Sequence, residues 1–480
     1  MTRGPAKSGL AALAAVLLTG CAATQGDAPS AETAAADTSG SAAKLPPDNP
    51  YPSTYAPLPA RTTLIANAVI LDGAGGRIDG GSLLLRDGKV VALGKRVDAP
   101  ADAVVIDADG RWVTPGIIDN HSHLGVYASP GVRAHSDGNE ATAPNTAEVW
   151  AEHSVWPQDP GFVRALAGGV TSLQILPGSA NLFGGRSVTL KNVPSRTVQG
   201  MKFPDAPHGV KMACGENPKR VYGSRGRSPA TRMGSFAGYR TAWIKARDYK
   251  DKWDDYEQKV AAGEDAKAPT RNLELETLKG VLEGEIRLHM HCYRADEMAQ
   301  VIDMSREFGY HIGTFHHAVE AYKIADLLDD NGTCAAMWAD WWGFKMEAYD
   351  GIRENIPFVH KAGGCAIVHS DSQVGIQRLN QEAAKALSDG NAAGLDIPKA
   401  EAWRWLSLNP AKSMGVDDVT GSLEPGKMAD VVLWSGDPFS TYSKADTVFV
   451  DGALVWDRHD ETYQPVMDFE LGQPGAGDVK

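Results

Sequence analysis

Residues 115–123 have the sequence Pro-Gly-Ile-Ile-Asp-Asn-His-Ser-His, in which an apolar run ends in two histidines, His121 and His123. Side chains two positions apart on a β-strand point to the same side. The stretch therefore predicts a buried strand whose carboxyl end presents two imidazoles to one face. Neutral imidazoles held in this way are typical ligands of Zn²⁺ and similar ions.

Three other apolar runs also end in groups that can bind a metal: His289-Met290-His291, His316-His317 and His369-Ser370-Asp371. A single histidine at a strand end is usually a buried, satisfied side chain or a surface residue. Catalytic groups and metal ligands, in contrast, gather at the carboxyl ends of barrel strands. Four strands that end in this way predict one shared site.

The segment 114–414 alternates apolar runs with helical stretches, which favours a parallel sheet with crossover helices. Eight strands are expected, around Ile117–His123, Val170–Leu176, Ser187–Leu190, Val210–Ala213, Ile286–His291, His311–His317, Thr333–Trp338 and Cys365–Asp371. Eight such units predict an α/β fold of the (β/α)₈ TIM-barrel type. An open doubly wound sheet is the competing architecture, but no Gly-rich dinucleotide motif follows an early strand. The charge-rich segment 248–278 is expected to be a solvated helical insertion.

Two β-rich blocks, 59–113 and 415–463, flank the barrel segment and contain short apolar runs separated by Asp-Gly turns. Neither block is large enough for a good core of its own. We therefore expect both to join into one small composite β-sandwich. Residues 464–480 are expected to form a C-terminal tail.

The N-terminus has the features of a secretory signal over residues 1–20, with a short basic start and the apolar run Leu10–Leu18. It ends in Leu18-Thr19-Gly20-Cys21, which resembles the lipobox of bacterial lipoproteins. That resemblance implies a lipid on Cys21 and an anchor on the periplasmic side of a membrane, with Ala22 favouring the outer membrane. Residues 21–58 are expected to be a flexible tether. The alternative is an ordinary signal peptide with an incidental cysteine.

The composition argues against some classes of function. The chain has 480 residues, with 60 acidic against 47 basic side chains and a net charge of −13. This balance argues against a nucleic-acid binder, which normally carries a basic stripe. Apart from Cys21, the four cysteines (Cys214, Cys292, Cys334 and Cys365) have no paired spacing. They are predicted to be small buried core residues rather than a disulfide frame, although a periplasmic location would permit bridges.

Taken together, residues 62–458 resemble the amidohydrolase superfamily of metal-dependent hydrolases, in its imidazolonepropionase and dipeptidase-like branch. The resemblance rests on the stretch 115–123, on Gly169-Val170-Thr171-Ser172, on the downstream histidines and aspartate, and on the stretches 409–412 and 421–430. It implies a (β/α)₈ barrel with a small β-sandwich, and one or two divalent metal ions, with zinc the first expectation.

The resemblance also implies roles for single residues. His121 and His123 would bind the more buried metal, and His289 and His317 would bind a second one. Asp371 would touch the buried metal and act as the general base, taking a proton from the attacking water and passing it to the leaving amine.

The ligand that bridges two ions has three interpretations. Many relatives use a strand-four lysine carboxylated by CO₂, and Lys211 within 209–213 matches that pattern. Glu216 is the rival, because some deacetylase members use a glutamate. The third interpretation is that Lys211 simply pairs with an acid, since a lysine inside a barrel is unfavourable unless it is neutralised or modified.

The remaining polar residues near the strand ends have weaker expectations. Strand alternation sends His316 away from the face of His317, so His316 is expected to be structural. His291 shares the face of His289 and is expected to contact substrate, to support a ligand, or to be the ligand itself. His369 is expected to orient a neighbour such as Asp371.

Substrate contacts are expected from two loops. Lys219, Arg220 and Arg232 follow strand four and could grip a substrate carboxylate, although a solvated basic loop is equally compatible. Trp341 and its neighbours follow strand seven, where an aromatic side chain could form a wall of the pocket or simply pack.

These expectations converge on a lipid-anchored periplasmic hydrolase that uses a metal to cleave an amide-type C–N bond, linear or cyclic, in a small molecule. A dipeptidase of the Xaa-Pro type acting on short peptides is the enzyme alternative, and a deaminase is less favoured. A non-catalytic binding lipoprotein on the same barrel is the alternative of another class. Membrane contact is expected through the lipid alone, and assembly into a homo-oligomer stays open.

Overall fold

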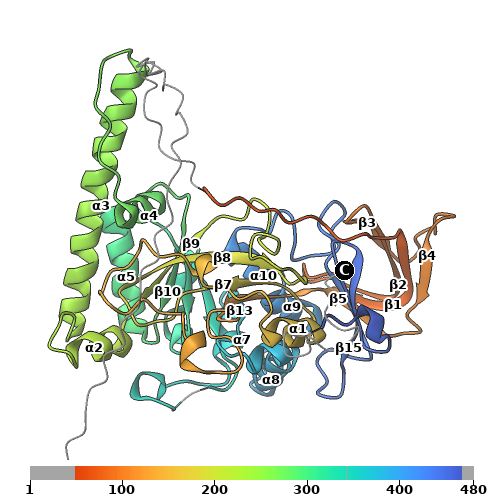
Figure 1. Ribbon diagram of the computed structural model, residues 1–480. Helices are drawn as coiled ribbons and strands as arrows, with labels where there is room; N and C mark the ends of the chain where they lie inside the picture. Colours follow the sequence, from red (N-terminus) through yellow and green to blue (C-terminus); the bar gives the residue numbers. More distant parts are fainter. Residues whose placement is uncertain (1–48, 342, 467–480) are drawn as a thin grey trace, which may run out of the picture. The chain divides into compact units, whose positions relative to one another are not determined.

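The computed structural model of the protein describes residues 49–341 and 343–466 (Figure 1). The predicted signal peptide, Cys21, most of the tether and nearly all of the C-terminal tail lie outside the described residues. Two eight-stranded sheets organise the described part. One is the barrel sheet, and the other joins the two ends of the chain.

The barrel sheet has its strands in sequence order, from β6 to β13. They are β6 (Ile117–Ser122), β7 (Val170–Ile175), β8 (Phe183–Lys191), β9 (Gly209–Ala213), β10 (Arg287–His291), β11 (Ile312–His316), β12 (Cys334–Met337) and β13 (Ala366–Val368). All eight lie where the sequence predicts a strand. The amide nitrogen of Asp371, just after β13, donates to the carbonyl oxygen of His121 on β6 at 3.0 Å, so the barrel is nearly closed.

One strand departs from the predicted parallel barrel. β8 runs antiparallel to both β7 and β9, whereas the other neighbouring pairs are parallel. The prediction of eight parallel strand-and-helix units is therefore wrong at β8. Only residues 176–182 connect β7 to β8, and a parallel return needs a crossover of a dozen or more residues. The chain accordingly turns back on itself there.

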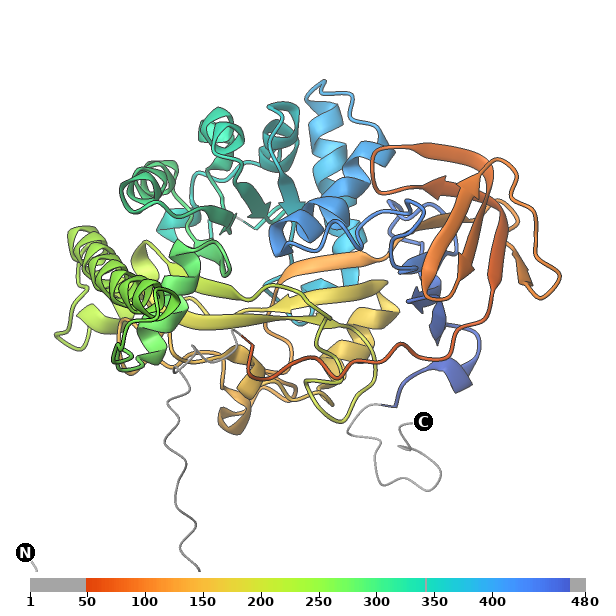
Figure 2. The ribbon, with the colours of Figure 1, turned by 90° about the horizontal axis from the view of Figure 1, so that it is seen from above.

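Helices cover the parallel part of the barrel, as Figure 2 shows for the arc that surrounds its strands. They are α1 (Pro160–Ala167), α5 (Ala295–Phe308), α6 (Ala325–Asp330), α7 (Asn355–Lys361), α8 (Leu379–Ala392), α9 (Lys399–Trp403) and α10 (Leu408–Met414). Because both faces of the strands are covered, β6, β7, β8 and β9 are buried at every position.

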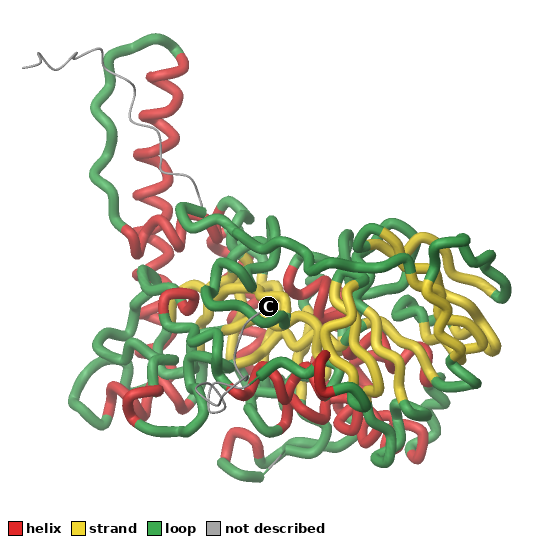
Figure 3. Tube along the Cα trace, turned by 45° about the vertical axis from the view of Figure 1, so that its right-hand side comes forward, coloured by secondary structure: helices red, strands yellow, loops and turns green. Residues whose placement is uncertain are grey.

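The predicted helical insertion, residues 248–278, is part of a longer helical segment between β9 and β10. This segment contains α2 (Glu216–Gly223), α3 (Arg232–Ala261) and α4 (Leu273–Leu282), and Figure 3 shows the long helix α3 with a loop returning beside it. The insertion is less solvated than its charge suggests. Tyr249, Trp253 and Tyr256, at helical spacing on α3, form a buried cluster against Leu275 of α4.

The second sheet contains strands from both ends of the chain, in the order β16-β15-β14-β5-β1-β2-β3, with β4 beside β1. The strands are β1 (Thr63–Leu71), β2 (Arg77–Arg86), β3 (Lys89–Gly94), β4 (Val104–Asp107), β5 (Trp112–Pro115), β14 (Val431–Trp434), β15 (Ala445–Val450) and β16 (Ala453–Asp457). β14 pairs antiparallel with β5, so the two blocks join through pairs such as Leu433 with Val113. These pairings form one continuous sheet; the sandwich and the exact domain boundaries stay predictions.

A buried ion cluster links the barrel to this sheet. The Lys191 ammonium, on β8, lies 3.0 Å from a carboxylate oxygen of Asp430 and 3.1 Å from one of Asp451. The Tyr55 hydroxyl donates to the other carboxylate oxygen of Asp451. Lys191 is fully buried, so its charge is stable there only because both aspartates neutralise it.

The cysteine prediction is wrong. Cys214 is bonded to Cys292 and Cys334 to Cys365, at sequence separations of 78 and 31 residues. Each bridge joins the ends of neighbouring barrel strands, β9 with β10 and β12 with β13. Spacing along the chain could not show this, because the strand order of the barrel brings each pair together.

None of the helices formed by residues 49–341 and 343–466 combines the length and the apolar character needed to cross a bilayer.

Candidate metal centre

The first imidazole pair lies where the sequence predicts it. His121 is on β6 and His123 follows it directly; His121 is fully buried and the His123 side chain is 16% exposed. The Nδ1 atom of His123 lies 2.8 Å from the carbonyl oxygen of Leu176. A carbonyl can only accept a hydrogen bond, so Nδ1 carries a proton and the neutral ring keeps a lone pair on Nε2.

Asp371 completes this group. One of its carboxylate oxygens lies 3.0 Å from His123 Nε2 and 3.3 Å from His121 Nε2. The three side chains form one of two clusters of metal-capable groups among the described residues. Burial alone would raise the pKa of Asp371, but the neighbouring His317 and His123 outweigh it and hold that pKa well below its usual range. The carboxylate is therefore charged near neutral pH.

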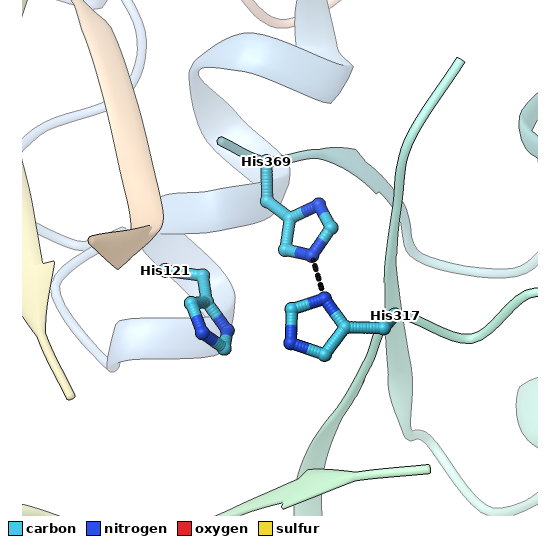
Figure 4. Close-up of side chains that lie close together, drawn as sticks. All are labelled: His121, His317 and His369. Carbon is cyan, nitrogen blue, oxygen red and sulfur yellow. Dashed lines mark hydrogen bonds between the residues drawn. The ribbon is translucent and has the colours of Figure 1, made fainter. Parts of the chain in front are cut away.

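The second cluster contains His121, His317 and His369, whose ligand atoms lie within 4.8 Å of one another (Figure 4). His369 Nε2 lies 2.7 Å from His317 Nδ1. His369 was expected to orient a neighbour, and this contact with His317 fits that expectation. The structure also brings its ligand atom within 4.8 Å of that of His121.

The direction of the His316 side chain differs from the one that strand alternation predicts. It does not point away from the site: Nδ1 of His316 lies 2.8 Å from Nδ1 of His121, and the rings of His316 and His317 both contact the ring of His121. The reason is local. His317 follows the end of β11 and has a φ of +57°, so the extended alternation stops between the two histidines.

His289 and His291 lie at different depths on β10. His289 Nδ1 is 3.0 Å from His316 Nε2, and His289 belongs to neither cluster of metal-capable groups among the described residues. His291 lies nearer the opening, with its ring centroid 4.9 Å from that of His317 and 4.8 Å from that of Tyr293. Neither ring nitrogen of His291 has a hydrogen-bond partner among the described residues, although the side chain is buried.

Burial keeps the histidine rings of the site neutral. It lowers the pKa of His289 to about 3 and that of His369 to about 4, and it holds the pKa values of His121, His316 and His317 well below the ordinary value. Neutral imidazoles with one carboxylate form the donor set that Zn²⁺ and related divalent ions prefer. The residues therefore fit a metal ion.

Lys211 lies on β9 beside His289, to which it is register-paired, and is fully buried. Its ammonium donates to the carbonyl oxygen of Pro177 at 3.0 Å. Within the described part of the chain, no carboxylate forms an ion pair with it, which contradicts the interpretation that Lys211 pairs with an acid. Burial lowers the pKa of Lys211 to about 8, although Asp371 pulls in the opposite direction.

The rival bridging residue lies apart. Glu216 begins α2, its side chain is 32% exposed, and it faces the Lys345 ammonium at 4.0 Å. It belongs to neither cluster of metal-capable groups among residues 49–341 and 343–466.

The predicted carboxylate grip is not assembled around Arg232. Its guanidinium is held by two largely buried carboxylates, Glu297 at 2.7 Å and Glu347, so it serves the packing of α3. Lys219 and Arg220 lie on α2, half-buried and exposed respectively. They stay available to solvent and to a ligand.

The aromatic residues after β12 stack beside the second histidine cluster. Trp341 stacks on Trp338 with ring centroids 5.2 Å apart, and Trp338 stacks on His317 at 4.4 Å. Trp341 also borders a groove of about 730 Å³ that includes Ser372 and Arg378. The stack therefore connects the second histidine cluster to an open groove.

The sequence interpretation gave too little weight to three side chains at the opening. Trp338 follows β12 directly, and Tyr293 follows β10 after Cys292. The Lys345 ammonium lies 4.1 Å from the centre of the Tyr293 ring. Their only signal in the sequence was their position just beyond a strand end, which packing aromatics share.

Asp119 was also missed as a supporting residue. It is fully buried on β6 and accepts hydrogen bonds from the Ser370 hydroxyl and from the backbone amides of His121 and Ser370. It thereby ties the strand that carries His121 to the segment that carries Asp371.

These features define a barrel protein in which histidines and an aspartate, gathered at the strand ends, could hold a metal ion. The chain belongs to the amidohydrolase family. It is 35% identical to an amidohydrolase of known structure from Thermotoga maritima, with a TM-score of 0.75 over 82% of this chain and 100% of that one. The sequence profile described as "Amidohydrolase family" matches residues 353–455.

Two further relatives have named activities. The amidohydrolase tasK of Hapsidospora irregularis is 33% identical over 78% of this chain, which spans only 40% of that protein's length. An imidazolonepropionase of Mesorhizobium japonicum is 24% identical over 76% of this chain and 90% of its own length. The chain therefore matches each of these two relatives over about three quarters of its own length.

Proposed function

We propose that the protein is a metal-dependent hydrolase that cleaves an amide-type C–N bond, linear or cyclic, in a small molecule. The observation that carries this proposal is the Asp371 carboxylate lying 3.0 Å from His123 Nε2 and 3.3 Å from His121 Nε2. A carboxylate directed at two buried imidazole nitrogens is arranged to share a cation with them.

In this proposal His121, His123 and Asp371 hold the first ion, with zinc the first expectation. A second ion, where one binds, is assigned to His317 and His369. The sequence-based partner His289 is set aside because it contacts His316 instead. A bound divalent ion lowers the pKa of a water molecule and polarises a carbonyl group.

Asp371 is the proposed general base. Its carboxylate is ionised near neutral pH and partly exposed to the opening, with 27% of the side chain accessible. It accepts a proton from the attacking water and returns it to the leaving nitrogen, since an amine leaves far more readily once protonated. Trp338 and Trp341 shield one side of the site and provide a flat surface for substrate.

Lys211 is the proposed bridging residue, in a carboxylated form. Its lowered pKa of about 8 raises the fraction of neutral amine near physiological pH, and the neutral amine is the form that reacts with CO₂. The resulting carbamate would remove a positive charge from a fully buried position, where an unpaired ammonium is unfavourable. Glu216 is the alternative only if α2 moves.

The cellular setting is also proposed: a lipid on Cys21 and a location on the periplasmic side of a bacterial membrane. The two disulfides support an oxidising compartment, because such bridges are rare in the reducing cytosol. Full-length protein should fractionate with membranes, whereas Cys21→Ser should be soluble or uncleaved. Equal retention of both forms on membranes would remove the lipid anchor from the proposal.

Metal analysis and a substrate panel test the activity. Purified protein should contain one to two divalent ions per chain and hydrolyse at least one member of a panel of amides, dipeptides and lactams. The double variant His121→Ala/His123→Ala should lose both the ions and turnover. His459→Ala, whose side chain is 64% exposed, is the matched control and should keep both. Full metal occupancy in the double variant contradicts the proposal.

A further inference from the structure

The two histidines of the first pair fix their protons in different ways. His123 Nδ1 faces a backbone carbonyl, which settles its tautomer. His121 Nδ1 instead faces Nδ1 of His316 at 2.8 Å, and an imidazole nitrogen can either donate or accept. The contact alone therefore does not decide whether His121 Nε2, the atom that faces Asp371, carries a proton or a lone pair.

The position of the proton on His121 depends on a chain of buried side chains that are joined by hydrogen bonds. His316 Nε2 lies 3.0 Å from His289 Nδ1, and His289 Nε2 lies 3.3 Å from the amide nitrogen of Gln174. All four residues, from His121 to Gln174, are fully buried. Gln174, on β7, is the last member.

All hydrogen bonds of this chain must run in the same direction. A neutral imidazole has one N–H and one lone pair, so a donor at one end makes every ring donate in the same direction. If Gln174 offers its N–H, the chain ends with a proton on His121 Nε2. If Gln174 offers its oxygen, every bond reverses and Nε2 keeps its lone pair. Only the second arrangement lets Nε2 bind a metal.

We infer that the side-chain oxygen of Gln174 is the terminal acceptor of this chain in the metal-loaded protein. Gln174, His289 and His316 are then positioning residues that hold His121 in its metal-binding tautomer. The inference rests on the proposed function in one respect, that His121 is a metal ligand.

Two observations at the end of the chain support this role. The Gln174 oxygen is buried without a hydrogen-bond partner among the described residues, and a half-turn of the amide exchanges its oxygen and nitrogen and gives that oxygen a donor. Gly209 also keeps the contact open: a Cβ there would lie 2.6 Å from Cδ2 of His289 and 2.5 Å from the hydroxyl of Ser187, which already contacts the Gln174 amide.

Nitrogen NMR of histidine-labelled, zinc-loaded protein tests the direction. The expected result is a metal-bound Nε2 with a protonated Nδ1 on His121, and protonated Nε2 atoms on both His316 and His289. A proton on Nδ1 of His316 or His289, or zinc bound to His289, overturns the inference while leaving the proposed function intact. No effect of zinc on His121 overturns both.

Variants provide a second readout, the zinc affinity measured by competition with a chelator. Gln174→Leu has no acceptor and should weaken zinc binding by about 10–100-fold, the usual effect of losing a partner behind a ligand. Gln174→Glu keeps an acceptor and should restore the affinity to within a few-fold of the natural protein. Thr189→Val is the matched control, because Thr189 pairs with Gln174 across β7 and β8 and its buried hydroxyl has no partner among the described residues.

Thr189→Val should change zinc affinity by less than about twofold. Wild-type affinity in Gln174→Leu, or an equal loss in Thr189→Val, overturns the inference. Circular dichroism checks that each variant folds; if Gln174→Leu does not, the NMR of the natural protein still decides the direction.

Discussion

Two residues at the site, His317 and Asp371, have left-handed backbone conformations, with φ values of +57° and +52°. Side chains other than glycine adopt this region rarely, and such strain is often kept where it positions a functional group. His317 follows β11 directly, and Asp371 follows β13 after His369 and Ser370. The unusual backbone ends the strand alternation there and directs both side chains towards His121.

Asp371→Asn separates catalysis from metal binding. The amide keeps the shape and one oxygen that faces the ion, but it cannot take a proton at neutral pH. We expect kcat on a verified substrate to fall by roughly two to four decades, the usual contribution of positioned acid–base catalysis, with only partial loss of metal. Asp340→Asn, at the groove, is the control and should keep kcat within a few-fold. Near-wild-type kcat in Asp371→Asn would show that another group is the base.

Lys211→Ala tests the carbamate. Removing the buried amine should lower the metal content, and short carboxylic acids such as acetate should restore part of the activity by occupying the bridging position. Lys219→Ala, on α2, serves as control and should neither lose metal nor respond to acetate. Unchanged metal content in Lys211→Ala would return the bridging role to Glu216 or leave a single ion.

It could be predicted from the sequence that His121, His123 and Asp371 lie together, because this depends only on strand alternation and on where the strands end. The sequence interpretation misjudged the direction of His316 and did not foresee that His369 comes close to His121. Their placement depends on a backbone φ after β11 and on a hydrogen bond of His369 to His317. Neither has a signature in the order of residues.

Among the elements, strand positions could be predicted and strand direction at β8 could not. Apolar runs mark buried segments whichever way the chain runs, and only the short 176–182 connection restricts the direction. The helical insertion was predictable from its charge. Its buried stripe, Tyr249, Trp253 and Tyr256, needed the observation that three aromatic residues share one face of α3.

The two disulfides connect neighbouring strands and should contribute measurably to stability. Closing loops of 78 and 31 residues stabilises the folded state by about 4 kcal/mol each in the chain-entropy treatment. We expect Cys334→Ser/Cys365→Ser, and separately Cys214→Ser/Cys292→Ser, to lower the urea midpoint markedly. A reducing agent should lower the urea midpoint of the natural protein in the same way. It should not change the midpoint of a variant in which all four of these cysteines are serine. Mass spectrometry that finds four free thiols in the natural protein contradicts the prediction.

For the whole molecule, the buried histidines predict how stability depends on pH in metal-free protein. Their folded-state pKa values, about 3 for His289 and about 4 for His369, lie below the ordinary value of about 6.5. At a pH between the folded and the ordinary pKa, the unfolded chain binds protons that the folded chain does not. The contribution of these histidines to the free energy of unfolding is therefore complete above pH 6.5 and is lost as the pH falls towards 4. Asp119 opposes this by one proton, because burial raises its pKa to about 7.

The histidines with lowered pKa values outnumber the carboxyl groups with raised ones, so the free energy of unfolding should fall by more than about 1.4 kcal/mol per pH unit below pH 6.5. Urea titrations with a chelator at pH 7.5, 6.5 and 5.5 measure this slope. A zinc-loaded sample should resist the loss over the same range, because bound metal competes with protons for the same nitrogens. Equal stability of the metal-free protein at all three pH values would contradict the prediction.

The pairing of β5 with β14 has a consequence for the time at which the protein can fold. Val431 lies beside Pro115, and the apolar cluster of this sheet includes Ile65 and Leu83 from one end of the chain with Val431 and Phe449 from the other. A ribosome that adds about 5–20 residues per second needs about 15 to 60 s to make the roughly 300 residues between them. Throughout that interval the early strands have an exposed edge and no completed core. The first strands therefore cannot complete their pairing and packing before the last strands have been synthesised.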